Sequence, residues 1–137
     1  MIEEKRIYVV VAGTVQVPVS TIRHEGKVLP DLRKGLRTVV QPSGRQFAQG
    51  IHVGSKLRFE LGIPGNDRIT TITLSARDSA ELGHIYFLLH KKHIGKTMWS
   101  DDNIDVYGPG EWPTAIAAYA TKKQTIGILD YLPKWGE

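Results

Sequence analysis

A run of β-branched and aliphatic residues near the N-terminus constrains the fold of this chain more than any other feature. The run reads IYVVVA and lies between a charged segment and Gly13. Apolar residues that follow one another without polar alternation are typical of a strand that is buried on both faces. Residues 6–12 are therefore predicted to form the first strand, buried on both faces. A chain of 137 residues suits a single domain, here residues 1–137.

The rest of the chain predicts alternating helices and strands after one irregular segment. Prolines and glycines break any period in residues 14–42, which we expect to form a loop of hairpin character with strand-like pieces at 15–19 and 37–40. The further elements expected are a helix at 45–61 with Ser43 as N-cap, a strand at 68–76, a helix opened by a Ser75/Asp78 or Asp78/Glu81 capping box, strands at 97–100 and 114–120, and a helix at 122–132. This order predicts an α/β fold, a single-domain three-layer sandwich whose four-stranded mixed sheet carries helices on both faces.

The positive charge of the chain is concentrated in one segment. The formal net charge is +4, but residues 22–58 hold eight Lys or Arg against two acids, a local balance of +6. This balance favours an anionic partner. No apolar run approaches the ~20 residues that cross a bilayer, so a cytoplasmic protein without a membrane partner is expected.

Common catalytic and metal-binding signatures are absent from the sequence. It contains no cysteine, no nucleophile elbow, no phosphate-binding loop and no H-E-x-x-H motif. His90 and His93 in HKKH fit the end of a helix dipole better than a metal site, and DDNID at residues 101–105 fits a solvated acidic loop. Neither a metal nor a cofactor is predicted.

Two segments resemble the archaeal-type (type 2) peptidyl-tRNA hydrolases. The sequence SGRQFAQGIHV from residue 43 is similar to the first-helix motif K-G-K-x-A-A-Q-x-x-H-A, with Gly44, Ala48, Gln49 and His52 in register. The sequence WSDDNIDVYGPGEWPTAIAAY from residue 99 is similar to R-D-A-G-x-T-x-I-x-x-G-T-x-T-V-L-A-I-G. The resemblance covers residues 5–12 and 43–130, and the basic insertion at 14–42 is a departure from the family.

The resemblance implies ester hydrolysis between a peptide, or an N-blocked amino acid, and tRNA. The candidate catalytic residues that it implies are Arg45, Gln49, His52, Asp101 and Thr114. Thr114 reaches its position only with a one-residue insertion, and Arg45 stands where the family has a lysine. Because arginine keeps its proton, it can stabilise an oxyanion but cannot move a proton. Asp101, or a neutral His52, would then orient or deprotonate the attacking water, and Gln49 and Thr114 would orient the acyl group.

The basic insertion is the expected contact for tRNA or peptidyl-tRNA, and the resemblance also suggests a homodimer. The candidate RNA-binding residues are Arg23, Lys27, Arg33, Lys34 and Arg37. A solvated loop explains the same charges equally well. Two other functions stay open. One is a non-catalytic member of the fold that binds RNA or a protein. The other is a small-molecule site at the glycine-lined helix, suggested by Gly13, Gly50 and Gly54.

Overall fold

The computed structural model describes residues 3–136. Its strands are β1 (Lys5–His24), β2 (Lys27–Val40), β3 (Thr71–Asp78), β4 (Gly95–Asp101) and β5 (Trp112–Thr121). Its helices are α1 (Ser43–Leu61), α2 (Ser79–Lys91) and α3 (Ile104–Tyr107), followed by a 3₁₀ turn, η1 (Lys123–Thr125). Between residues 3 and 136, no helix is both long and apolar enough to span a bilayer.

The five strands form one sheet in which β1 is the central element. The order is β2-β1-β5-β4, and β3 pairs with β1 outside this order. The first half of β1 pairs with β3 and β5, and its second half pairs with β2. The β1/β3 pair is parallel, while β1/β2, β1/β5 and β4/β5 are antiparallel. The expected four-stranded α/β sandwich is therefore wrong, because the sheet has five strands and is mainly antiparallel.

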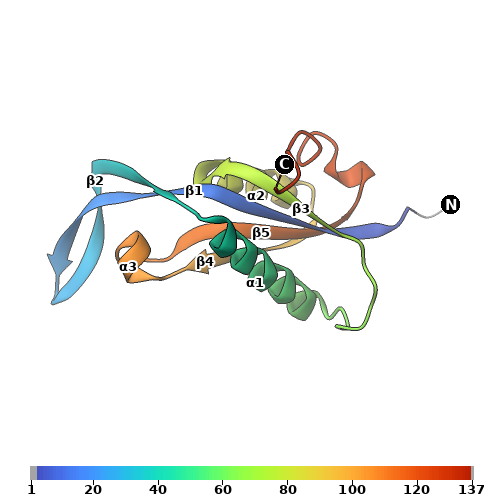
Figure 1. Cartoon of the computed structure of the whole chain (residues 1–137), viewed down its shortest axis with the longest axis horizontal. Coiled ribbons are helices and arrows are strands. Elements are labelled where there is room, and N and C mark those ends of the chain that lie inside the picture. The colour runs from blue at the N-terminus through green and yellow to red at the C-terminus, as the bar shows by residue number, and fades with distance from the viewer. Residues whose placement is uncertain (1–2, 137) are drawn as a thin grey trace.

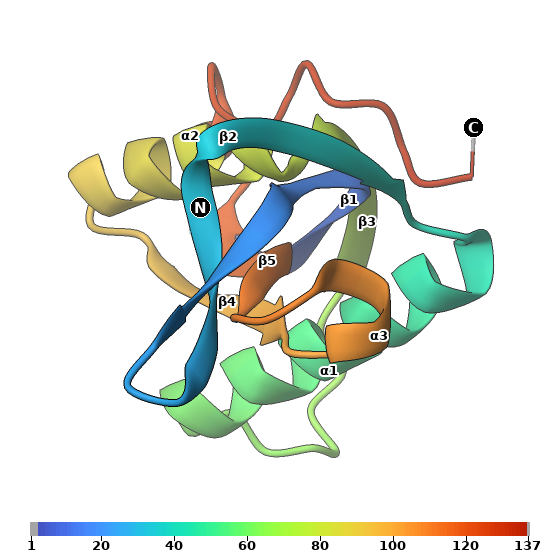
Figure 2. The ribbon, with the colours of Figure 1, turned by 90° about the vertical axis from the view of Figure 1, so that its left-hand side faces the viewer.

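The fifth strand arises because β1 does not stop at Gly13. It runs on through the segment expected to be a loop of hairpin character and pairs with β2 from Thr14↔Val40 to His24↔Lys27. The hairpin and the strand-like pieces at 15–19 and 37–40 are present, but they belong to two long strands and not to a loop. At the tip, Glu25 and Gly26 both have positive φ, 51° and 78°, which is the requirement of a tight hairpin turn whose twist matches the strands. The resulting two-stranded arm projects from the body of the molecule (Figures 1 and 2). The prolines and glycines of this segment therefore lie in a long two-stranded arm whose strand register shifts between Pro18 and Ser20.

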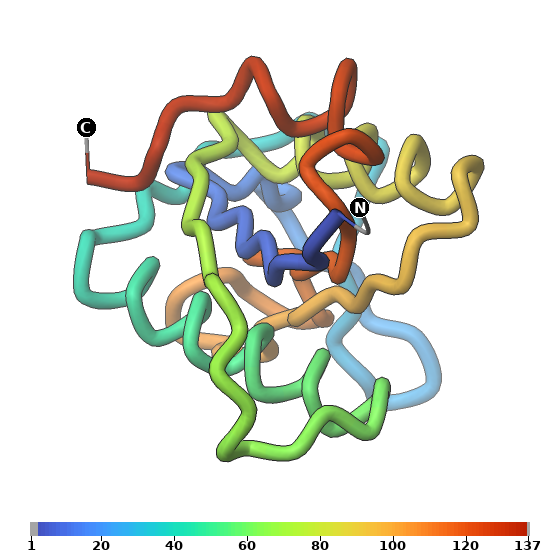
Figure 3. Tube along the Cα trace, turned by 90° about the vertical axis from the view of Figure 1, so that its right-hand side faces the viewer, coloured from blue at the N-terminus to red at the C-terminus, as the bar shows by residue number. Residues whose placement is uncertain are grey.

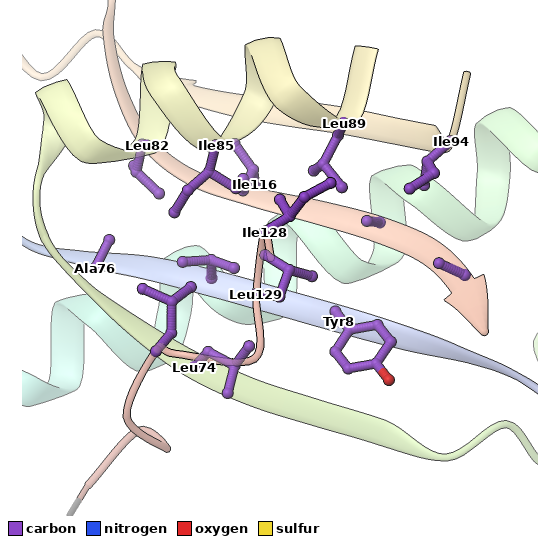
Figure 4. Packing of buried hydrophobic residues seen from close by; sticks show 14 of the residues in the cluster. Tyr8, Leu74, Ala76, Leu82, Ile85, Leu89, Ile94, Ile116, Ile128 and Leu129 are labelled. Atoms are coloured by element: carbon purple, nitrogen blue, oxygen red, sulfur yellow. The ribbon is translucent and has the colours of Figure 1, made fainter. Parts of the chain in front are cut away.

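Alternate residues of β1 point to opposite sides and contact different helices. Ile7, Val9 and Val11 pack with Val53 and Leu57 of α1. On the other side, a larger cluster includes Tyr8, Leu74, Leu82, Ile85 and Leu89, under α2 (Figure 4). Both contacts bury apolar surface, which is the main stabilising contribution to the fold. Since β1 is covered on both sides, its continuous hydrophobicity has a direct structural reason.

One helix start differs from the sequence prediction, and a second agrees with it in part. Ser43 is the first helical residue of α1, and the cap is Pro42, with no side-chain hydrogen bond. Asp78 caps α2 by accepting a hydrogen bond from the Glu81 amide, as the Asp78/Glu81 pattern predicts, but the Glu81 carboxylate accepts from the Arg77 amide and not from that of Asp78, and Ser75 lies inside β3.

The helix expected at 122–132 reduces to η1 and a series of turns, which cross the sheet (Figure 3). Gly127 has φ 82°, and its amide donates to the Asp130 carboxylate. These local bonds satisfy the backbone in turns, so a continuous helix does not form.

Candidate active site between α1, β4 and α3

Helix α1 lies along β4, and their side chains meet at successive points. From the start of α1 to its end, the pairs are Gln49 with Asp101, His52 with Trp99, Lys56 with the Met98 carbonyl, and Glu60 with Thr97. The residue numbers rise on α1 while they fall on β4, so the helix and the strand run in opposite directions. The start of α1 therefore lies beside the end of β4 and the α3 loop that follows it.

The contact between Gln49 and Asp101 joins the two sequence segments that carry the family resemblance. Gln49 Nε2 donates to Asp101 Oδ2 at 2.7 Å. Gln49 is only 4% exposed, and within the described residues its Oε1 is a buried acceptor without a hydrogen-bond partner. The other carboxylate oxygen, Asp101 Oδ1, accepts a hydrogen bond from the backbone amide of Asn103 at 3.0 Å. The carboxylate is thus fixed by two donors, and an unsatisfied carbonyl oxygen lies on the amide beside it.

His52 lies three residues further along α1 and stacks on Trp99. The ring centroids are 4.7 Å apart, and the rings are inclined by 20°. His52 is exposed, whereas Trp99 is half-buried and packs against the apolar cluster under α1. The indole supports one face of the imidazole at the edge of the site.

Thr114 lies behind the site, inside the protein. It is fully buried, and its hydroxyl donates to the Trp99 carbonyl at 3.3 Å. The strand register of β4 and β5 shifts next to this bond, between Trp99 and Ser100. Thr114 therefore positions the end of β4, and a contact with the acyl group, as the sequence analysis expects, does not fit its burial.

Sequence reasoning missed Tyr107, whose ring lies beside Arg45, and Gln41, which is hydrogen-bonded to Tyr107. Tyr107 is 1% exposed and donates to Gln41 Oε1 at 2.6 Å, and Arg45 Cζ lies 6.0 Å from the centre of the Tyr107 ring. Burial raises the pKa of the Tyr107 phenol, with smaller opposing effects from Arg45. The only sequence signal was an aromatic residue followed by glycine, VYG, inside an acidic loop.

The five candidate RNA-binding residues all lie on the arm, but they are not equivalent. Arg33 is paired with Asp31 at 3.0 Å, and this hydrogen bond is the largest cause of the lowered pKa of the Asp31 carboxyl. Arg37 donates to the Val106 carbonyl in α3, at the base of the arm. Arg23 and Lys27 lie next to the hairpin tip, far along the strands from α3. The structure thus connects one of these cations to the site and spreads the others along the ribbon.

The other features singled out in the sequence lie elsewhere. In residues 3–136, no three His, Cys, Asp or Glu side chains gather as a metal site would require. Gly50 faces Val9 and Val11, where an added Cβ would make ordinary contacts at 3.5 Å. Gly50 and Gly54 also line a groove of about 320 Å³ on the β3 side of α1, with Phe47 and Trp135.

No protein-family model matches the sequence, and no curated protein matches it. A functional assignment therefore depends on the side-chain geometry and on the resemblance of the two motifs.

Proposed function

We propose that this protein hydrolyses the ester bond that joins a peptide, or an N-blocked amino acid, to tRNA. The observation that supports the proposal is the 2.7 Å hydrogen bond between Gln49 and Asp101, two motif residues 52 positions apart. A buried amide with one unpartnered oxygen is costly, by about 1–3 kcal/mol, and such costs concentrate at functional sites. Because this oxygen is also shielded from solvent, a water or a substrate N–H reaches it only after neighbouring side chains move.

In the first step, Asp101 acts as the general base. Its carboxylate is held by Gln49 and the Asn103 backbone amide, so it can orient a water molecule and accept its proton. The water oxygen then forms a bond to the ester carbonyl carbon. A positioned base of this kind contributes typically about 10²- to 10⁴-fold to a rate.

The oxyanion that forms on the carbonyl oxygen needs a positive environment, which the start of α1 supplies. Arg45 lies in the first turn beside Tyr107, and no capping side chain accepts a hydrogen bond from the first amides of α1. The positive end of the 19-residue helix adds to the same field. When the tetrahedral intermediate collapses, the bond to the ribose oxygen breaks, and the proton held by Asp101 passes to that oxygen.

The arm supplies the proposed contact with the tRNA phosphates. Arg23, Lys27, Lys34 and Arg37 are exposed on the ribbon, and Arg33 is held by Asp31. Because Arg37 donates to the Val106 carbonyl of α3, RNA bound along the arm would lead towards the site. Such contacts make affinity strongly dependent on salt.

The test is release of the acyl group from N-acetylaminoacyl-tRNA by the purified protein. We expect wild-type activity, a loss of at least about 100-fold in Asp101→Asn, and a loss of about 10²- to 10³-fold in Arg45→Ala, with Arg45→Lys in between. His84→Ala is the matched control, because His84 is an exposed histidine on α2, on the opposite side of the sheet. Release by the wild type no faster than in buffer would contradict the proposal.

One observation favours a second function, tRNA binding without catalysis. The position of the motif lysine holds Arg45, whose guanidinium does not give up its proton at accessible pH. If the family reaction needs a lysine that transfers a proton, the wild type would bind tRNA without hydrolysing it. Gain of hydrolysis in Arg45→Lys would then show that the wild-type site has lost its catalytic activity through this substitution.

A further inference from the structure

The stack of His52 on Trp99 has an unused aromatic face. The two rings are nearly parallel at 4.7 Å, and His52 is exposed while Trp99 is partly buried beneath it. The imidazole therefore has one face against the indole and the other towards solvent. An exposed ring held flat by a second ring is the arrangement on which nucleobases stack in single-strand binding proteins.

The position of this stack relative to Asp101 is set by two regular elements. Trp99 and Asp101 are alternate residues of β4 and point to the same side, about 7 Å apart along the strand. His52 and Gln49 are three residues apart on α1, about 5–6 Å between their Cβ atoms. The stack and the Gln49/Asp101 pair are therefore adjacent contacts of the same helix with the same strand, separated by roughly the width of a nucleoside sugar.

We propose that the exposed face of His52 is a stacking site for the terminal nucleobase of tRNA. This inference rests on the proposed function, in which the ester oxygen belongs to the 3′-terminal ribose. The base and the ester are attached to the same sugar, so a base stacked on His52 places the ester beside Asp101. Stacking needs only a π face, and it assigns His52 a binding role that does not depend on proton transfer.

Trp99 and Thr114 keep this stacking site in place. The Thr114 hydroxyl binds the Trp99 carbonyl, and the indole packs against the buried cluster under α1. Because Trp99 is fixed in this way, little side-chain entropy remains to be lost when a base binds. His52 itself contacts the ligand, while Trp99 and Thr114 position it.

The experiment compares two RNA hairpins that mimic an acceptor stem, one ending in CCA and one with an abasic 3′-terminal nucleotide. Binding is measured by fluorescence anisotropy at one fixed salt concentration, with a label on the hairpin loop. We expect the wild type to bind the complete hairpin about 5- to 100-fold more tightly, the range for one stacked base. His52→Ala should bind both hairpins equally, and His52→Phe should retain the preference because it keeps an aromatic ring. His84→Ala should behave as the wild type.

The outcomes separate this inference from the proposed function. Neither hairpin carries an acyl group esterified to its 3′ ribose, so the binding preference does not require catalysis. A preference that disappears in His52→Ala, in a protein that releases no acyl group, would support the stacking site and contradict the hydrolase proposal. Equal binding of the two hairpins by the wild type would overturn the stacking site, even if the protein proves to be a hydrolase. A preference that survives in His52→Ala would overturn it as well.

Discussion

Replacement of Gln49 by methionine should separate the functional role of this side chain from a structural one. The amide of Gln49 makes one strong bond, to Asp101, and leaves its buried Oε1 without a partner among the described residues. Gln49→Met keeps the length of the side chain and removes both the bond and the unsatisfied oxygen. We therefore expect little change in the free energy of unfolding together with reduced ester hydrolysis.

The magnitude follows from two opposing contributions. A hydrogen bond to a charged group contributes about 1.5–3 kcal/mol, and a buried unsatisfied polar atom costs about 1–3 kcal/mol. Asp101 is half-buried, so water can replace the lost donor. The net change for Gln49→Met should therefore lie within about 1 kcal/mol of zero. Asp101→Ala differs, because it leaves both polar atoms of the buried Gln49 amide unpaired and should destabilise by about 1–3 kcal/mol.

Urea denaturation of both single variants and the double variant gives the coupling between the two residues. With a slope of about 1–3 kcal/mol per molar urea, a 2 kcal/mol loss moves the midpoint by about 1 M. Gln46→Met is the matched control on α1, since both polar atoms of Gln46 are bonded, to the Gln41 carbonyl and to Trp135. It should lose about 1–2 kcal/mol. A Gln49→Met variant destabilised by more than about 2 kcal/mol, and more than Asp101→Ala, would refute the reasoning.

Three further predictions concern Tyr107, the arm and the core. Burial raises the pKa of Tyr107, so the folded state keeps the phenol proton at a pH near 10 where the unfolded chain releases it. The free energy of unfolding therefore falls as the pH rises through the raised pKa. Tyr107→Phe should cost about 1–2 kcal/mol at pH 7, where Gln41 Oε1 loses its donor, and should show a smaller alkaline loss in urea titrations at pH 7 and above pH 10. Gly26→Ala puts a Cβ at φ 78° and should speed amide hydrogen exchange in the arm by about 5- to 30-fold, while unchanged exchange would contradict the turn geometry. Leu57→Ala, at a fully buried position, should lose about 2–5 kcal/mol in thermal or urea unfolding, and a loss below about 1 kcal/mol would be inconsistent with the packing under α1.

Local patterns located the elements whose contacts are also local. The run at residues 7–12, the periodicity of α1 and the Asp78 cap of α2 each depend on residues close together in the sequence, and each is present in the structure. The errors fall where distant residues decide. The extent of the strands in residues 14–40 depends on the pairing of β1 with β2, and Val15 and Val17 are buried in a cluster with Tyr107.

The candidate site shows the same division. Gln49, His52 and Asp101 were chosen because the two segments that hold them resemble motifs of the peptidyl-tRNA hydrolases, and the structure brings Gln49 and Asp101, 52 positions apart, into contact. Tyr107 and Gln41 were missed because their hydrogen bond joins residues 66 positions apart, of which only Tyr107 lies in a segment that carries the resemblance. The burial of Thr114 also could not be read from its spacing, although it changes the role of this residue from contact to support.

The sequence by itself determined that a strand at residues 7–12 is buried on both faces, that α1 and α2 form, and that positive charge collects between residues 22 and 58. These properties follow from the order of residue types within short windows, where side-chain shape and the repeat of a helix or strand act directly. Only the tertiary structure decided that the basic segment is a β-ribbon, that the sheet has five strands, and that His52 rests on Trp99 beside Asp101. Those outcomes depend on strand pairing and packing between residues that are far apart in the sequence. Such contacts form only when the chain between them is ordered, so a short window of sequence does not reveal them.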